Sequence, residues 1–223
     1  MSTPYPQAVI FDLDGVITDS AEHHFLAWQQ LGQELSIPFD RQFNETLKGV
    51  NRMDSLERIL SLGQANDRYS ETEKMALAEK KNRYYVESIQ HLTPRDVLPG
   101  IIDLLKDLRQ NKIKIAMASA SKNAQFVSER LEVDHYFDHI VDAATVEKSK
   151  PHPEVFLKAA TAVGVAPTDC VGIEDAAAGV EAIKSAGMRA IAIGDADILN
   201  AADLVLTDTS KLSLTTLSGV FSK

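Results

Sequence analysis

Three features are scarce or missing in this chain of 223 residues. Cys170 is the only cysteine, so no internal disulfide can form, and the apolar run around it favours a buried thiol over a catalytic one. No apolar run is long enough to span a membrane. Positive charge is also short, with 23 Lys and Arg against 32 Asp and Glu and a formal net charge of −9. This balance argues against sequence-independent binding to nucleic acid, although a few local cations would suffice for a phosphorylated small molecule.

Residues 1–6 lack the basic and apolar regions of a secretory signal, so we expect none. We therefore expect a cytoplasmic protein. A hydrophobic content of 44% with 25% charged residues is typical of a soluble globular protein. The length allows one large domain, or one domain with a second, smaller one.

Short β-like runs recur along most of the chain, and helical patterns separate them. The runs predict strands over residues 8–13, 114–119, 139–143, 170–174, 189–194 and 203–206. Apolar spacing predicts helices over residues 101–108, 153–163 and 176–186. Alternating strands and helices predict an α/β fold, a doubly wound parallel sheet covered on both faces.

Residues 20–92 interrupt this rhythm. Long amphipathic patterns over residues 25–35, 53–62 and 71–89 predict a helical domain inserted directly after the first strand. The α/β core domain would then comprise residues 1–19 and 93–223. Taken alone, Trp28 is typical of the core of the insert rather than of a ligand-stacking residue.

Two acids two residues apart follow the first predicted strand. Strand alternation would place Asp12 and Asp14 on the same side, and Gly15 lets the chain turn immediately after them. At the carboxyl end of a parallel strand, such a pair can bind a divalent cation, attack an electrophile and move a proton. The alternative is a strand end with two solvated acids.

Residues that suit a phosphate occur in two later segments. Ser119 ends the second predicted strand, and the N–H groups after it open toward a helix start, where the helix dipole favours an anion. Taken alone, Ser121 or Asn123 is more typical of an ordinary helix cap. Lys150 could neutralise a phosphoryl oxygen or be a solvated surface cation. A cis bond to Pro151 would set the direction of this lysine.

Glu174 and Asp175 close the fourth predicted strand, and their oxygens suit Mg²⁺, which prefers octahedral oxygen ligands. The order of these signals is more specific than any one of them. Acids at the first strand end, a serine at the second, then a lysine and an acid pair resemble the motif series of the haloacid dehalogenase superfamily. The resemblance covers essentially the whole chain.

Finer residues resemble the β-phosphoglucomutase family, namely His24, the runs 47–52 and 118–123, and Lys81-Asn82. The resemblance implies a Rossmannoid core with a helical cap and a magnesium-dependent isomerase. Such an enzyme interconverts β-D-glucose 1-phosphate and β-D-glucose 6-phosphate through the 1,6-bisphosphate and an aspartyl phosphate. The implied partner is a phosphorylated sugar, with no nucleic acid or membrane, and the expected state is a cytoplasmic monomer.

The resemblance also implies roles for individual residues. Asp12 would be the nucleophile and Asp14 the general acid and base, with Ser119 and Lys150 balancing the charge of the transferring phosphate. Magnesium would be held by the side chains of Asp12, Glu174 and Asp175 and the backbone carbonyl of Asp14. The remaining residues would bind the substrate or order the acid and the closing cap: Ser20, His24, Trp28, Lys48, Gly49, Val50, Arg52, Ser55, Lys81, Ala120, Ser121, Lys122 and Asn123.

A mutase needs a second phosphate site, because the bisphosphate must turn around and present either phosphate to Asp12. Arg52 can grip an anion with its bidentate fork, and residues 121–123 would complete that site. Without the resemblance, Arg52 would be typical of a solvated helix-face arginine near Asp54 and Glu57.

Other functions share the core motifs. A sugar phosphatase of the same superfamily would let water attack the aspartyl phosphate, and only the run 48–52 in the insert favours the mutase. A non-enzymatic switch that accepts a phosphoryl group is disfavoured by the long insert and by the acid Asp14. A non-catalytic binding protein would not need both Asp12 and Asp14.

Overall fold

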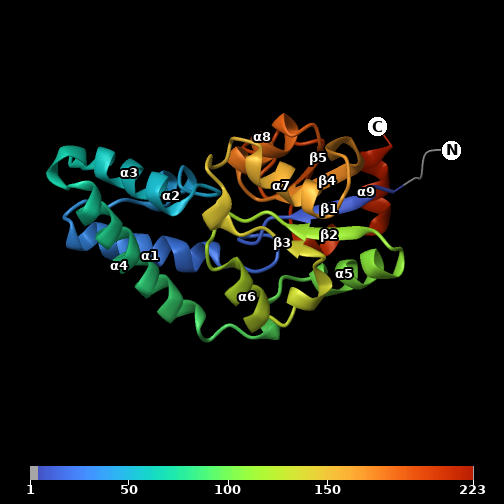
Figure 1. Cartoon of the computed structure of the whole chain (residues 1–223), viewed down its shortest axis with the longest axis horizontal. Coiled ribbons are helices and arrows are strands. Elements are labelled where there is room, and N and C mark those ends of the chain that lie inside the picture. The colour runs from blue at the N-terminus through green and yellow to red at the C-terminus, as the bar shows by residue number, and fades with distance from the viewer. Residues whose placement is uncertain (1–4, 223) are drawn as a thin grey trace.

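A parallel sheet forms the centre of the larger part of the chain (Figure 1). The computed structural model describes residues 5–222, so the first four residues of the amino-terminal segment discussed above lie outside it. The sheet has six strands in the order β3-β2-β1-β4-β5-β6, and every neighbouring pair is parallel. The strands are β1 (Ala8–Phe11), β2 (Lys114–Met117), β3 (His139–Ile140), β4 (Cys170–Glu174), β5 (Arg189–Ile193) and β6 (Leu204–Leu206). The predicted α/β fold is confirmed.

The register brings the ends of three strands to one edge of the sheet. Phe11, the last residue of β1, pairs with Met117 on β2 and with Ile173 on β4. The ladder continues one residue further, because the N–H of Asp12 donates to the carbonyl of Ile173 at 2.9 Å. The residues that follow β1 and β2 and those that end β4 therefore meet at the carboxyl edge, where α/β proteins place their ligands.

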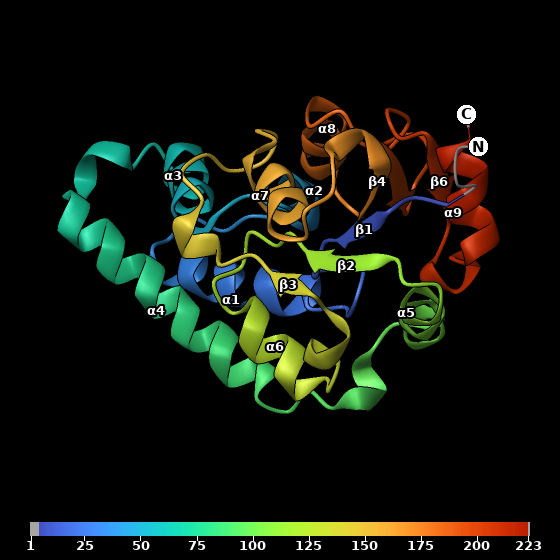
Figure 2. The same ribbon diagram turned by 45° about the vertical axis from the view of Figure 1, so that its right-hand side comes forward.

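Helices cover both faces of the sheet (Figure 2). Helices α7 (Glu154–Ala162) and α8 (Ala177–Ser185) pack on one face, and α5 (Ile101–Gln110), α6 (Ala124–Arg130) and α9 (Leu214–Phe221) pack on the other. Alternation along β1 serves both layers, since Val9 and Phe11 enter one apolar cluster while Ala8 and Ile10 enter the other. Helices α5, α7 and α8 match the predictions, and α6 begins where a helix start after Ser119 was predicted, whereas α9 was not predicted.

The insert is a separate helical layer beside the carboxyl edge of the sheet (Figure 1). It contains α1 (Ala21–Glu34), α2 (Arg41–Glu45), α3 (Arg52–Leu62) and α4 (Glu71–Ile89), and we call this segment the cap. Its own apolar cluster includes Phe25, Trp28, Leu31 and Leu56. Helices α1, α3 and α4 match the predicted ones, while the short α2 was not predicted.

Polar capping residues fix where α3 and α4 of the cap begin. Ser70 and Glu73 form a reciprocal capping box at the start of α4. The side chain of Asn51 accepts the N–H of Asp54 at 2.9 Å and so begins α3. Both helix starts are therefore set by local sequence.

The fold bears on two expectations from the sequence, which concern the thiol of Cys170 and a membrane-spanning segment. Cys170 is buried in the apolar layer beneath α7 and α8, and burial raises the pKa of its thiol to about 12. It is therefore not a nucleophile. Within residues 5–222, no helix combines the length and the apolar character needed to cross a membrane.

Candidate active site

A cavity of about 580 Å³ lies between the cap and the carboxyl edge of the sheet. Residues from the end of β1, from the cap helices and from the loop before α6 line it. Most of the predicted site residues are among them: Asp12, Asp14, His24, Trp28, Lys48, Gly49, Val50, Arg52, Ser55, Lys81, Ala120, Ser121, Lys122, Asn123 and Asp175.

Four other predicted residues lie just behind the cavity wall. Ser20, Ser119, Lys150 and Glu174 are all buried. Ser119 and Lys150 border a small void of about 20 Å³. The hydroxyl of Ser119 accepts the N–H of Ser121 at 3.0 Å, which fixes the turn that leads to α6.

A buried lysine joins the ends of two strands. The Nζ of Lys150 lies 2.6 Å from Oδ1 of Asp12 and 2.5 Å from Oε1 of Glu174. The side chain of Lys150 is completely buried, so it is not a solvated surface cation. The bond between Lys150 and Pro151 is cis. Asp12 is only 4% exposed, which contradicts the alternative of a solvated acid.

Backbone groups and one glycine hold Glu174 in place. Its Oε2 accepts the N–H groups of Asp175 at 2.8 Å and of Ala176 at 2.9 Å. A Cβ at Gly179 would lie 1.8 Å from Oε1 of Glu174, so only glycine fits there. Gly179 was not predicted, because its only signal in the sequence is a glycine early in the helix that follows the acid pair.

Three carboxylates converge beside the cavity. Side-chain oxygens of Asp12, Glu174 and Asp175 lie within 4.8 Å of one another. Gly15, at a φ of +76°, allows the close approach, because a Cβ there would lie 2.4 Å from Oδ2 of Asp175. Burial raises the pKa of Asp12 to about 8 and that of Asp175 well above its usual 3.8. An all-oxygen donor set of high negative charge fits a hard divalent cation, which would favour the ionised carboxylates.

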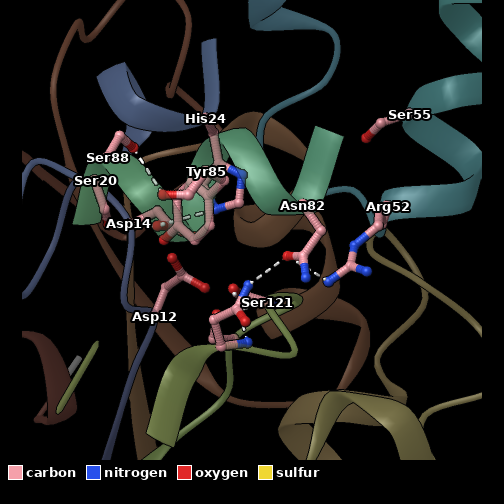
Figure 3. Close-up of polar contacts among 12 residues, drawn as sticks. Asp12, Asp14, Ser20, His24, Arg52, Ser55, Asn82, Tyr85, Ser88 and Ser121 are labelled. Atoms are coloured by element: carbon pink, nitrogen blue, oxygen red, sulfur yellow. Dashed lines mark hydrogen bonds and ion pairs between the residues drawn. The ribbon is translucent and has the colours of Figure 1, made fainter. Parts of the chain in front are cut away.

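The carboxylate of Asp14 has different partners from that of Asp12 (Figure 3). Its Oδ1 accepts a hydrogen bond of 2.5 Å from the hydroxyl of Ser20. Burial raises its pKa, while the Ser20 hydrogen bond lowers it. Strand β1 ends at Phe11 rather than at residue 13, and the chain already turns at Leu13, whose carbonyl accepts the N–H of Ile17 at 2.9 Å, so strand alternation does not set the direction of Asp14.

A neutral histidine supports this part of the wall. The Nε2 of His24 lies 3.6 Å from Oδ1 of Asp14, and its Nδ1 lies 2.7 Å from Nζ of Lys81. The ring also stacks on Tyr85, with centroids 3.8 Å apart. Burial and the Lys81 cation lower the pKa of His24 well below 6.5, so Nδ1 accepts from Lys81 and Nε2 carries the proton. Tyr85 was not predicted.

Trp28 lies at the boundary between the core of the cap and the cavity. It belongs to the apolar cluster of the cap and also lines the cavity. The ammonium of Lys81 lies 4.7 Å from the centroid of its ring, a cation–π contact. Burial lowers the pKa of Lys81 to about 7.

At another part of the cavity wall, Arg52 is held by two side chains of α4. Its Nη1 lies 2.6 Å from Oε1 of Glu79, and its Nη2 donates to Oδ1 of Asn82 at 2.8 Å. The side chain is 16% exposed, so Arg52 is not a solvated arginine of the helix surface. Asn123 stands at the N-cap position of α6 without a capping hydrogen bond. Its Nδ2 instead donates to Oδ1 of Asn82 at 3.0 Å.

Comparisons with known proteins agree with this geometry. The family model described as haloacid dehalogenase-like hydrolase matches residues 6–187. The chain is 51% identical to the β-phosphoglucomutase of Bacillus subtilis, over 93% of this chain and 92% of that protein. It is 32% identical to the fructose-1-phosphate phosphatase of Escherichia coli, over 82% and 94% of the two chains. The crystal structure of a Clostridium difficile β-phosphoglucomutase superposes with a TM-score of 0.95 at 46% identity, covering 97% of each chain.

Proposed function

This chain belongs to the haloacid dehalogenase-like hydrolase family, and we propose that within it the chain is a β-phosphoglucomutase. The enzyme interconverts β-D-glucose 1-phosphate and β-D-glucose 6-phosphate through β-D-glucose 1,6-bisphosphate. One observation carries the proposal: the cavity that contains the buried Asp12 also contains a second group of phosphate-type donors, Arg52 and Asn123. A cytoplasmic location and a monomeric state are part of the same proposal.

Asp12 carries the phosphoryl group between the two positions of the sugar. The phosphorylated carboxylate transfers the group to the C6 hydroxyl of β-glucose 1-phosphate, which gives the bisphosphate and the free carboxylate. The bisphosphate then turns around in the cavity. Asp12 attacks the phosphorus at C1, the bond to the C1 oxygen breaks, and glucose 6-phosphate leaves. The aspartyl phosphate is thereby regenerated.

Asp14 moves the proton that each transfer requires. It takes the proton of the C6 hydroxyl as that oxygen attacks, and later returns it to the C1 oxygen as that oxygen leaves. Burial raises the pKa of Asp14, and a raised pKa makes its carboxylate a better acceptor for the proton of a sugar hydroxyl. Ser20 and the protonated Nε2 of His24 keep its side chain away from the three converging carboxylates.

Cations at the strand ends neutralise the negative charge of the transferring phosphoryl group. Lys150 supplies one beside Asp12, and the hydroxyl of Ser119, which accepts the N–H of Ser121, keeps its own O–H to donate to a phosphoryl oxygen. Mg²⁺ would be held by the side chains of Asp12, Glu174 and Asp175 together with the backbone carbonyl of Asp14, and would neutralise charge on the phosphoryl oxygens.

The cap closes the site and binds the sugar. Its loop from Lys48 to Val50 meets the core, since a Cβ at Gly49 would lie 3.5 Å from Cδ of Lys150. Exclusion of water protects the aspartyl phosphate from hydrolysis. A phosphatase, in contrast, lets water hydrolyse it. The remaining cavity residues would contact sugar or phosphate oxygens: Trp28, Ser55, Lys81, Ala120, Ser121 and Lys122.

Replacing Arg52 tests the second phosphate site. We expect Arg52→Ala to lower mutase turnover by about 100-fold, because a charge-assisted bidentate contact is lost. Phosphorylation of Asp12 by a small donor such as acetyl phosphate should change little, since that donor has no second phosphate. Arg58→Ala is the matched control, because Arg58 is an exposed arginine of the same helix α3. Equal losses in both reactions of Arg52→Ala would refute the assignment.

A further inference from the structure

One amide oxygen connects the cap with the core at the second phosphate site (Figure 3). Oδ1 of Asn82, on α4 of the cap, accepts from Nη2 of Arg52 at 2.8 Å and from Nδ2 of Asn123 at 3.0 Å. Arg52 begins α3 of the cap, whereas Asn123 precedes α6 of the core. Both donors line the cavity, as does Asn82.

The chemistry of the donors fixes the orientation of the amides. A guanidinium group has only N–H donors, so the Asn82 atom that faces Arg52 must be its oxygen. Because that same oxygen faces Asn123, the atom that Asn123 presents must be its NH₂ group. The contact is therefore directional: a single acceptor on the cap orients one donor from each side of the cavity.

A neutral acceptor suits an anion site better than an acid would. The amide oxygen uses one N–H of Arg52 and leaves its charge in place, and further N–H groups stay available for a phosphate. The second partner of Arg52, Glu79, is 61% exposed, so water screens that ion pair. A carboxylate at the half-buried position 82 would instead neutralise Arg52 and repel a phosphate.

We propose that Asn82 is a positioning residue of the second phosphate site: it holds Arg52 and Asn123 together when the cap meets the core. The role rests on the proposed function, because it presumes that the non-transferring phosphate of the sugar binds there. Asn82 acts through its two partners and does not touch the reacting atoms. It thereby links closure of the cap to formation of the phosphate site.

Binding and kinetics of Asn82 variants test this role. The probes are glucose 6-phosphate and glucose 1,6-bisphosphate, titrated by calorimetry into the Mg²⁺-loaded protein, with KM and kcat measured in parallel. Asn82→Ala should weaken binding by about tenfold, the typical effect of a lost hydrogen bond to a charged group. Asn82→Asp, which keeps the shape, should weaken it by about 100-fold because of its charge. Phosphorylation of Asp12 by acetyl phosphate should stay unchanged in both variants.

A double-mutant cycle separates positioning from an independent contact. If Asn82 acts through Arg52 and Asn123, the double variant Arg52→Ala with Asn82→Ala should lose less affinity than the sum of the two single losses, because only the part that acts through Asn123 remains. The matched control is Asn66→Ala, in the cap but outside the cavity, which should bind like wild type. Thermal unfolding of every variant checks that the fold is intact.

Three results would overturn the proposal: additive losses in the cycle, wild-type binding by Asn82→Asp, or an equal loss in the acetyl phosphate reaction. Failure of the mutase function is distinguishable from these. A phosphatase would release inorganic phosphate from the sugar phosphates, yet the binding measurements would still report on Asn82. A wild-type protein that binds neither sugar phosphate would overturn both proposals.

Discussion

The Nζ of Lys150 lies 2.6 Å from Oδ1 of Asp12, and neither side chain is more than 5% exposed. The two residues are 138 positions apart in the sequence. Water screens this pair little, so each charge depends on the other for its stability in the folded protein. The same pairing places a cation beside the atom that we propose attacks phosphorus.

Replacing Lys150 should therefore affect both activity and stability. We expect Lys150→Ala to lower kcat by roughly 1,000-fold, because a preorganised cation at the transferring phosphoryl group is lost. The free energy of unfolding should fall by about 3 kcal/mol, since Asp12 and Glu174 are left without their cation. Steady-state kinetics and urea denaturation measure the two effects. The control is Lys148→Ala, which changes an exposed lysine of the same loop and should match wild type. A kcat within tenfold of wild type for Lys150→Ala would contradict the role assigned to Lys150.

Two helical glycines form a matched pair for testing the acid cluster. Gly179→Ala would place a Cβ against Glu174, whereas a Cβ at Gly219 meets nothing within 4 Å. We expect Gly179→Ala to weaken Mg²⁺ binding at least tenfold and to cost about 1–3 kcal/mol of folding free energy. Gly219→Ala should keep wild-type binding and gain up to about 1 kcal/mol. Calorimetric titration with Mg²⁺ measures the affinity of each variant. Wild-type affinity in Gly179→Ala would contradict a role of Gly179 in positioning Glu174.

The buried Lys81 should make stability depend on pH. Burial lowers its pKa to about 7, whereas in an unfolded chain it is 10.5. Between these values the unfolded state binds more protons, so the contribution of Lys81 to the free energy of unfolding increases as the pH rises. Below pH 7 this contribution is constant.

The contribution of Lys81 can be isolated by urea denaturation of wild type and Lys81→Met. We choose pH 7.5 to pH 9.5, which lies between the two pKa values. Relative to the variant, wild type should gain roughly 1 kcal/mol per pH unit. Lys80→Met is the control, because the neighbouring Lys80 is 40% exposed and its pKa is raised by Glu34. The difference in unfolding free energy between Lys80→Met and wild type should stay constant over the same range. A constant difference between Lys81→Met and wild type would contradict the lowered pKa of Lys81.

Periodicity predicted those parts of the fold that local sequence determines. Each of the six strands matches a predicted run, because buried strands read as short apolar segments. Helices α3 and α4 carry their own capping residues and long amphipathic patterns, so the sequence predicted them nearly residue by residue. The five residues of α2 show too little periodicity to be predicted, and for the seven residues of α6 the sequence indicated the helix start but not its length.

The site was predictable where residues follow strand ends and harder to predict where packing brings helices together. Asp12 and Glu174 stand at strand ends, which a parallel sheet collects at one edge. Asn82 and Gly179 have no such marker. Their roles depend on Arg52, Asn123 and Glu174, whose positions relative to them are set only when the cap meets the core and when α8 packs below β4.

The central claim is that this cavity moves a phosphoryl group between two oxygens of one sugar instead of giving it to water. The most direct measurement incubates the protein with Mg²⁺, β-glucose 1-phosphate and a trace of glucose 1,6-bisphosphate, and compares glucose 6-phosphate with inorganic phosphate over time. We predict that glucose 6-phosphate accounts for nearly all of the product. Mostly inorganic phosphate would contradict the account.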